Sequence, residues 1–133
     1  MNYQKIDQKL ERLNLKAGEY VFFEGDLDSD FYIIEEGQVE IFTKTKAGKR
    51  VTLVLVEEGE SFGEFALLDR RPRSASAQAK TDCCVVRISD EAYQQLLGEL
   101  PIWASSMLKS FARRLVNMNA KLKDSMQFID PKK

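Results

Sequence analysis

The chain reads VEIFTKTKAGKRVTLVLV from Val39 to Val56. Two runs, 39–43 and 51–56, are rich in branched aliphatic residues and threonine, and alternate side chains of each run would point to opposite faces of a strand. The turn Ala47-Gly48-Lys49 separates them, and a glycine turn between two such runs is typical of a β-hairpin. We therefore predict two antiparallel strands in this part of the chain.

Further β-prone runs precede this hairpin, at 20–23 and 31–34. Glycines separate the runs at intervals of roughly 7 to 12 residues. These glycines are Gly18, Gly25, Gly37, Gly48 and Gly59. Many short strands with regular turns indicate a sandwich or a barrel. The predicted fold class is mainly β with flanking helices, a β jelly roll with an N-terminal helix and C-terminal helices.

Helical spacing appears at both ends of the β region. Ile6, Leu10 and Leu13 share one helical face, which predicts a helix over 3–13. The triplet Ser89-Asp90-Glu91 supplies a helix start, and Pro101 is tolerated in the first turn of a longer helix. The expected organisation is one domain over 1–133. Its parts are a helix at 3–13, a β-roll at 14–89, C-terminal helices at 90–125 and a tail at 126–133.

Composition and charge set limits on the function classes. The net charge of −1 gives no global field that would attract nucleic acid or an anionic membrane. No apolar stretch approaches the roughly 18 residues of a membrane span, and the N-terminus lacks a secretory signal. The only two cysteines, Cys83 and Cys84, are adjacent, so a bridge between them would be strained and we expect buried, reduced thiols. These features predict a cytoplasmic location, no direct nucleic-acid binding and no membrane association.

The chain contains no histidine. This absence removes the commonest general base and the commonest metal ligand, and no Ser–His or Cys–His nucleophile can form. We therefore expect no catalytic residues, no metal ligands and no resident cofactor, and we do not expect an enzyme.

The stretch that carries chemistry reads FGEFALLDRRPRSASA from Phe62 to Ala77. Its early part is too short for a strand and contains good helix formers, which predicts one helical turn after Gly63. Free backbone N–H groups at such a turn bind phosphate, and a glycine lets a ligand approach the backbone closely. Arg73 follows with a planar fork that suits a phosphodiester, and the small residues after it leave room for a ligand.

Glu64 requires a separate argument, because a carboxylate beside a phosphate is repulsive unless it accepts from a donor of its own. A sugar hydroxyl is such a donor, and Arg73 nearby would offset the negative charge. The pattern then indicates a ligand with both phosphate and hydroxyl groups. Taken singly, Arg73 is more often a surface charge, and Glu64 also favours a helix N-terminus for reasons unrelated to a ligand.

At these residues the sequence resembles the cyclic-nucleotide-binding domain family. This family includes regulatory subunits of cyclic-AMP-dependent kinase, bacterial catabolite activator proteins and nucleotide-gated channels. Its phosphate-binding cassette reads approximately F-G-E-x-A-L-x(4)-P-R-x-A-[ST], and residues 62–76 match it without a gap. The glycine-punctuated segment 18–39 and the closing run 81–89 extend the resemblance, which covers roughly 12 to 125.

The resemblance implies roles for individual residues of the cassette (residues 62–77). Glu64 would accept the ribose 2′-hydroxyl, and Arg73 would pair with the cyclic phosphate. The backbone N–H groups of Ala66 and Ser74 would complete the phosphate cradle. Gly63 would allow close approach, and Phe65 belongs to the same ligand-binding set. The expected ligand is cyclic AMP, with cyclic GMP second.

The last helix carries an apolar seam with 3-4-3-4-3 spacing. Its members are Leu108, Phe111, Leu115, Met118, Leu122 and Ser125. The seam either covers the β core or pairs with a second copy to make a homodimer. By resemblance to the activators' dimer helix, Asn119 would lie near the purine, where the activators carry small hydroxyl residues instead.

Several functions are compatible with these patterns. The leading one is a cyclic-mononucleotide sensor in which binding rearranges the C-terminal helix and an effector protein reads the change. The alternatives are the sensor half of a longer transcription regulator without its DNA-binding part, a same-fold domain that binds another ligand such as a cyclic dinucleotide, and an interaction scaffold without a ligand.

Overall fold

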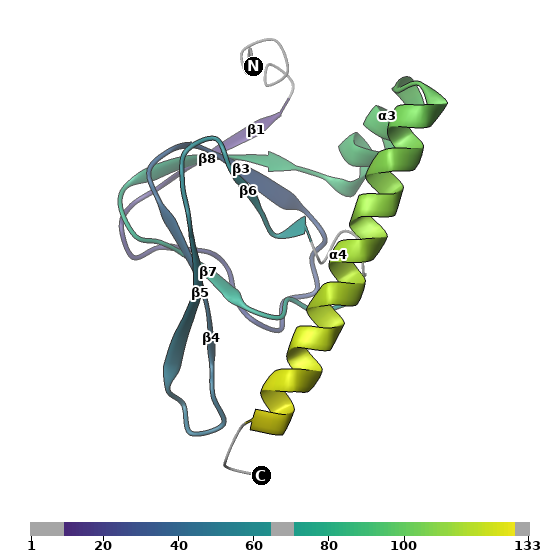
Figure 1. The fold of residues 1–133 in the computed structure, drawn as a ribbon. Helices are drawn as coiled ribbons and strands as arrows, with labels where there is room; N and C mark the ends of the chain where they lie inside the picture. The colour runs from purple at the N-terminus through teal and green to yellow at the C-terminus, as the bar shows by residue number, and fades with distance from the viewer. Residues whose placement is uncertain (1–9, 65–70, 130–133) are drawn as a thin grey trace. The chain divides into compact units, whose positions relative to one another are not determined.

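The computed structural model describes residues 10–64 and 71–129, without the side chains of 119–120 and 122–129. Residues 1–92 and 93–133 form two compact units. Among the described residues, eight strands precede two helices, and the colours of Figure 1 follow their order along the chain. The elements are β1 Glu11–Leu15, β2 Tyr20–Phe22, β3 Phe31–Glu36, β4 Val39–Lys44, β5 Arg50–Val56, β6 Ser61–Phe62, β7 Ser76–Ala79, β8 Cys83–Ile88, α3 Asp90–Glu99 and α4 Ile102–Ile129.

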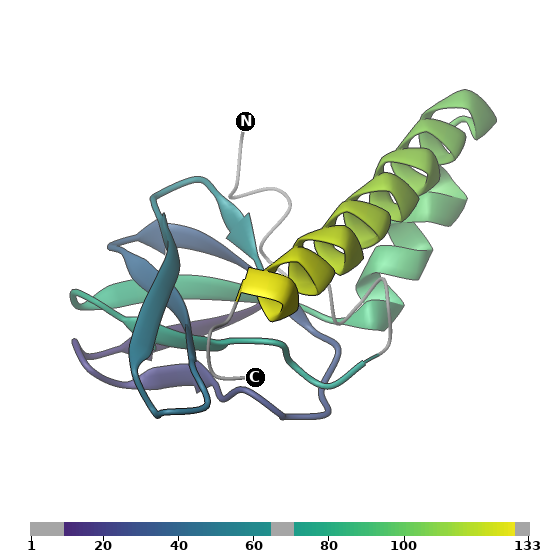
Figure 2. The ribbon, with the colours of Figure 1, turned by 60° about the horizontal axis from the view of Figure 1, so that its bottom comes forward.

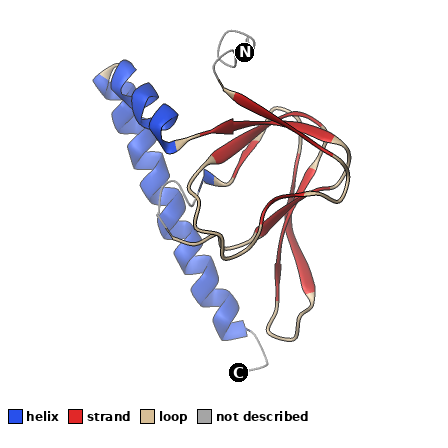
Figure 3. Cartoon of the chain, turned by 180° about the vertical axis from the view of Figure 1, so that it is seen from behind, coloured by secondary structure: helices blue, strands red, loops and turns tan. Residues whose placement is uncertain are grey.

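The strands form two four-stranded sheets in which every pairing is antiparallel. Their orders are β1-β8-β3-β6 and β2-β7-β4-β5, so all neighbours in a sheet except β4 and β5 are non-consecutive in the chain. Figure 3 shows these strands in red. The core takes buried side chains from both sheets, among them Ile34 and Val85 from the first and Val39 and Ala77 from the second, each with no exposed surface. The predicted mainly β jelly-roll class is confirmed.

The predicted hairpin is β4 and β5. Its turn contains Gly48 at a φ of 85°, in the left-handed region that glycine tolerates best, and the Thr45 amide donates to the Lys49 carbonyl at 2.9 Å. The two strands pair from Val39↔Val56 to Lys44↔Arg50, with one register shift between Ile41 and Phe42. The local sequence pattern of residues 39–56 was therefore sufficient to predict this hairpin.

The predicted helix over 3–13 is wrong at its C-terminal end, because residues 11–15 form β1. This strand pairs with β8 from Glu11↔Arg87 to Leu15↔Cys83. The alternation of Leu13 and Leu15 fits one face of a strand, and the pairing with β8 outweighs a short helical pattern. Residues 3–9 lie outside the described part of the chain.

The C-terminal helices begin where the sequence indicated. Ser89 caps α3, since its Oγ accepts from the Ala92 amide at 3.1 Å. α4 follows Pro101 as one continuous helix (Figure 2) and ends at Ile129, beyond the expected end near 125. Among the described residues, no helix is both long and apolar enough to span a membrane.

Candidate functional site

Arg73 is the buried charge of the β unit, with 4% of its surface exposed. Its Nε and Nη2 atoms donate to the two carboxylate oxygens of Asp28 at 3.1 and 2.7 Å. Nη1 donates to the carbonyl oxygen of Gly63 at 2.7 Å, and Nη2 also donates to the carbonyl of Asp30 at 2.5 Å. A guanidinium has five N–H groups, so these described partners occupy four of them.

Two backbone hydrogen bonds and one aromatic ring hold Arg73 in place. The Arg73 amide donates to Asp26 and its carbonyl accepts from Gly25, both at 2.8 Å, which fastens the loop 23–30 to the start of β7. The guanidinium carbon lies 4.0 Å from the centre of the Phe22 ring, a cation–π contact on a buried aromatic residue. The fork of Arg73 is therefore preoriented before any ligand arrives.

Gly63 faces the same guanidinium. Its φ is 85°, and a Cβ atom there would lie 3.0 Å from Nη1 of Arg73 and 3.2 Å from the Phe22 ring. Only a residue without a side chain fits this backbone against this arginine. In the structure the close neighbour of Gly63 is Arg73, and the expected close approach of a ligand to this glycine stays a prediction.

Asp28 is the counter-charge of Arg73, and the two differ in burial. Its side chain is 39% exposed, whereas that of Arg73 is 2% exposed. The ion pair is bidentate, with the Asp28 carboxylate partly in water and the Arg73 guanidinium in the core. Such an arrangement can exchange one anion for another, because the carboxylate can regain water if a second anion takes its place at the fork.

The aspartates of this loop also act on Tyr32, which is 4% exposed. The pKa of Tyr32 is raised to about 12, first by burial and next by the negative charge of Asp28. Asp30 extends the polar contacts to β8, where its Oδ2 lies 3.3 Å from Nε of Arg87. Arg87 in turn meets Glu11 of β1 at 3.0 Å. A chain of polar contacts thus leads from Arg73 to the strand that precedes α3.

The other predicted site residues lie in different settings. Glu64 is half-buried, and its Oε2 accepts from the Ser61 hydroxyl at 2.9 Å. Ser74 is exposed, next to the buried Ala75. Phe65 and Ala66 lie outside the described residues, as does the side chain of Asn119 on α4. The structure therefore brings Gly63 and Arg73 together, while the described contact of Glu64 is with Ser61.

Sequence reasoning missed Asp28, Asp30 and Phe22 as parts of this site. The available signal was the acidic run Asp26-Leu27-Asp28-Ser29-Asp30, three carboxylates in a loop between two strands. A buried arginine needs a counter-charge, and this loop carries three candidates. Which of the three would pair with Arg73 depends on the fold and could not be read from spacing.

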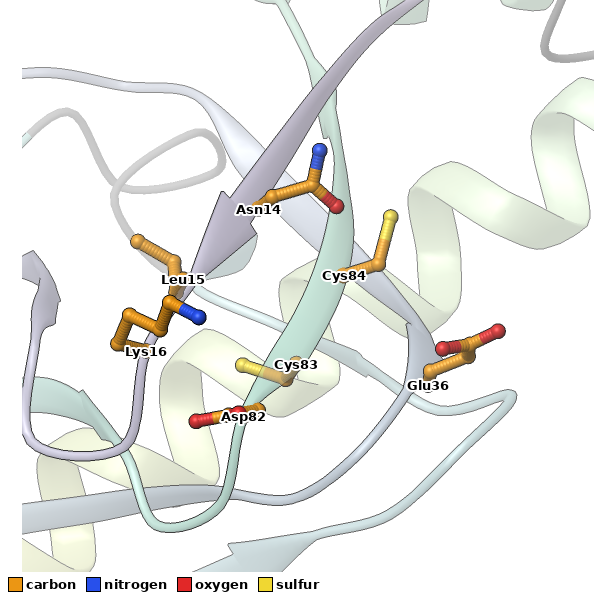
Figure 4. A pocket seen from close by; sticks show the side chains of 7 residues that line it. All are labelled: Asn14, Leu15, Lys16, Glu36, Asp82, Cys83 and Cys84. Atoms are coloured by element: carbon orange, nitrogen blue, oxygen red, sulfur yellow. The ribbon is translucent and has the colours of Figure 1, made fainter.

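A pocket of about 220 Å³ lies elsewhere in the β unit, where β1 and β3 end and β8 begins (Figure 4). Asn14, Lys16, Glu36, Asp82 and both cysteines contribute to its lining, and no residue of the cassette does. The side chains of Cys83 and Cys84 point to different sides of β8, as alternation along a strand requires. Both are free thiols, and burial raises the pKa of each. Cys83 is buried as expected, but Cys84 is only half-buried.

Comparisons with known proteins point in one direction. A family model described as the cyclic nucleotide-binding domain matches residues 12–99. The chain is 39% identical over 98 residues, 74% of its length, to the cyclic AMP receptor protein of Thermus thermophilus, and these residues make up 45% of that protein. It is 38% identical over 94 residues to a cAMP-dependent protein kinase regulatory subunit of Emericella nidulans, which covers 71% of this chain and 22% of that one.

A solved structure gives the same result for the fold. The catabolite activator protein of Thermus thermophilus matches with a TM-score of 0.74 at 33% identity, over 95% of this chain and 59% of that one. The chain thus spans less than half the length of both curated relatives.

Proposed function

This chain belongs to the cyclic nucleotide-binding domain family, and on that premise we propose that it is a regulatory sensor for a cyclic mononucleotide, cyclic AMP. The observation that carries the proposal is the buried Arg73, whose fork is preoriented and paired with a partly exposed carboxylate. The names of the two curated relatives support cyclic AMP as the ligand. The site needs no metal or cofactor for this task.

The chemistry we propose is an exchange of anions at Arg73. A cyclic phosphate carries one negative charge, as Asp28 does, and presents two oxygens to a planar fork. When the phosphate takes the fork, the Asp28 carboxylate turns to water and the guanidinium keeps a counter-charge throughout. The Gly63 carbonyl, which accepts from Nη1, would hold the guanidinium plane during the exchange.

Glu64 serves in this proposal as the acceptor for the ribose 2′-hydroxyl. Its half-buried carboxylate accepts from the Ser61 hydroxyl at one oxygen, and among the described residues no hydrogen bond occupies the other oxygen, which would accept from a sugar. The amides of Ala66 and Ser74 would contact the phosphate, Phe65 would flank the ligand, and Asn119 of α4 would contact the purine edge.

The output of the sensor is a second proposal. Binding would change the arrangement of α4, and an effector protein would read that change. The apolar side chains of α4 that are exposed in the structure support a role in contacts, including a homodimer. They are Ile102, Trp103, Met107, Phe111, Leu115 and Met118. Two free, adjacent cysteines support a reducing, cytoplasmic location.

Isothermal titration calorimetry tests the ligand and the site together. Wild type is titrated with cyclic AMP, cyclic GMP and a cyclic dinucleotide, and cyclic AMP is expected to bind most tightly. Arg73→Ala should abolish measurable binding, because a desolvated phosphate would lose its counter-charge. Arg12→Ala is the matched control, since Arg12 forms the same bidentate geometry with Glu35 at 2.8 and 3.0 Å but lies at the surface.

Two results would contradict the proposal. Unchanged affinity in Arg73→Ala would show that the ligand binds elsewhere, and tighter binding of the cyclic dinucleotide would favour the same-fold alternative. Glu64→Ala should narrow the preference for cyclic AMP over its 2′-deoxy analogue, because the variant lacks the acceptor for that hydroxyl.

A further inference from the structure

β5 is an unprotected edge strand. It stands at the end of the order β2-β7-β4-β5, and among the described strands only β4 pairs with it. It is seven residues long and carries three successive aliphatic side chains that are half exposed: Leu53 at 49%, Val54 at 50% and Leu55 at 39%. Backbone groups on the outer side of such a strand are available to pair with another strand.

Edge strands usually carry features that prevent pairing with another strand, such as charged residues or proline, and β5 has few such features. Between Arg50 and Glu57 it contains no charged residue and no proline. The register shift against β4 leaves Leu53 as an extra residue between Val54 and Thr52. This bulge adds twist, but it also brings a third aliphatic side chain into the exposed row. The middle of β5, from Leu53 to Leu55, is therefore an exposed apolar segment.

The charges at the two ends of β5 are of opposite sign. Lys46, Lys49 and Arg50 lie at its start, and Glu57, Glu58 and Glu60 follow its end. A second copy of the strand laid alongside in the antiparallel direction brings the basic end of each against the acidic end of the other. A parallel copy would bring like charges together, which is destabilising.

We propose that β5 pairs with β5 of a second copy in the antiparallel direction, so that the β2-β7-β4-β5 sheets of the two copies join into one. In the register centred on Leu53, Lys49 lies opposite Glu57 of the second copy and Thr52 lies opposite Val54. The contact is isologous, so each charge pair occurs twice and this interface by itself joins two copies. It involves no residue of the cassette and does not depend on the ligand.

The first experiment measures mass in solution by sedimentation over a range of protein concentrations. Val54→Lys places two like charges at the centre of the joined edge and should weaken association about tenfold or more. Leu96→Lys is the control, because Leu96 is 48% exposed on α3 and takes the same substitution. Wild type and Leu96→Lys should share an association step that Val54→Lys lacks, and identical sedimentation of all three would overturn the proposal.

A charge exchange tests the direction of pairing and does not depend on the stability of a core variant. Lys49→Glu and Glu57→Lys should each weaken association, and the double variant K49E/E57K should restore it, because the pair is then reversed rather than lost. Parallel pairing would not be rescued by the double variant, so failure of rescue overturns the antiparallel proposal. Calorimetry with cyclic AMP on the same variants should show wild-type affinity, which separates this inference from the proposed function.

Discussion

Arg73 illustrates how a buried charge constrains its surroundings. An isolated guanidinium in the core is strongly unfavourable, and the structure answers with one carboxylate, two carbonyls and an aromatic face. Three of these partners are fixed parts of the fold, namely Gly63, Asp30 and Phe22. Among these partners only Asp28 contacts the guanidinium through a charged group, and its side chain is partly exposed, so it is the partner that an anionic ligand would replace.

Asp28→Asn is predicted to have opposite effects on the empty protein and on its complex. Loss of the carboxylate leaves Arg73 without its counter-charge, which should lower the free energy of unfolding by about 1–3 kcal/mol. The same loss removes the competitor for the fork, so affinity for cyclic AMP should rise by roughly tenfold. Calorimetry and chemical denaturation, with and without ligand, measure the two effects.

The control for this prediction is Glu35→Gln, which removes the carboxylate partner of the exposed Arg12. It should change neither affinity nor, by more than about 0.5 kcal/mol, stability. Weaker cyclic AMP binding in Asp28→Asn would show that Asp28 orients Arg73 for the ligand and is not displaced by it.

Tyr32 makes a prediction for alkaline solution. Its folded pKa of about 12 lies above its ordinary 10.0, so the fold favours the neutral, protonated phenol. The resulting stability is fully present below pH 10 and is lost as the pH rises from 10 towards 12, up to about 2–3 kcal/mol. Tyr32→Phe cannot ionise, so the difference in unfolding free energy between wild type and this variant should change over that range. A difference that stays constant with pH would contradict the assignment.

At the scale of the elements, Gly63 directly follows β6, and its backbone carbonyl contacts the guanidinium of Arg73. We predict that Gly63→Ala lowers stability by about 1–3 kcal/mol, since both the positive φ and the 3.0 Å approach to Arg73 oppose a Cβ atom. It should also weaken cyclic AMP binding, because the displaced guanidinium loses its orientation. Thermal unfolding and calorimetry measure these effects.

Gly48→Ala separates the two causes. Gly48 has the same φ of 85°, but a Cβ atom there would meet nothing within 4 Å. It should therefore show the cost of the backbone alone and leave ligand affinity unchanged. Equal losses in both variants would mean that contact with Arg73 contributes nothing.

Elements with strong local patterns could be predicted from sequence. The β4–β5 hairpin and the Ser89 cap of α3 each follow from a few neighbouring residues. The predicted helix over 3–13 is wrong at residues 11–13, because the strand there depends on pairing with β8, some 70 residues away. The site divides in the same way, since the cassette marks Gly63 and Arg73 as candidates, whereas the contact between them and the choice of Asp28 as partner depend on the fold.

For the whole molecule, the division into two units raises the question of how the β unit affects the helical one. Residues 93–133 contain seven Lys or Arg and three Asp or Glu, so they carry +4 of a chain whose net charge is −1. The covalent link between the units runs through β8 and Ser89 to α3. The contacts from Arg73 through Asp30 to Arg87 end on that same strand. A change at the fork therefore has a physical connection to the start of the helices.

This connection predicts that ligand binding alters the helical unit as well as the site. With saturating cyclic AMP, hydrogen exchange of backbone amides in α4 should change together with that of loop 23–30, because exchange reports local opening in each segment. Arg73→Ala should show neither change, and Arg12→Ala should show both. Protection confined to the β unit in wild type would mean that the site binds its ligand without transmission to α4, and the sensor would then have to act through a surface of the β unit itself.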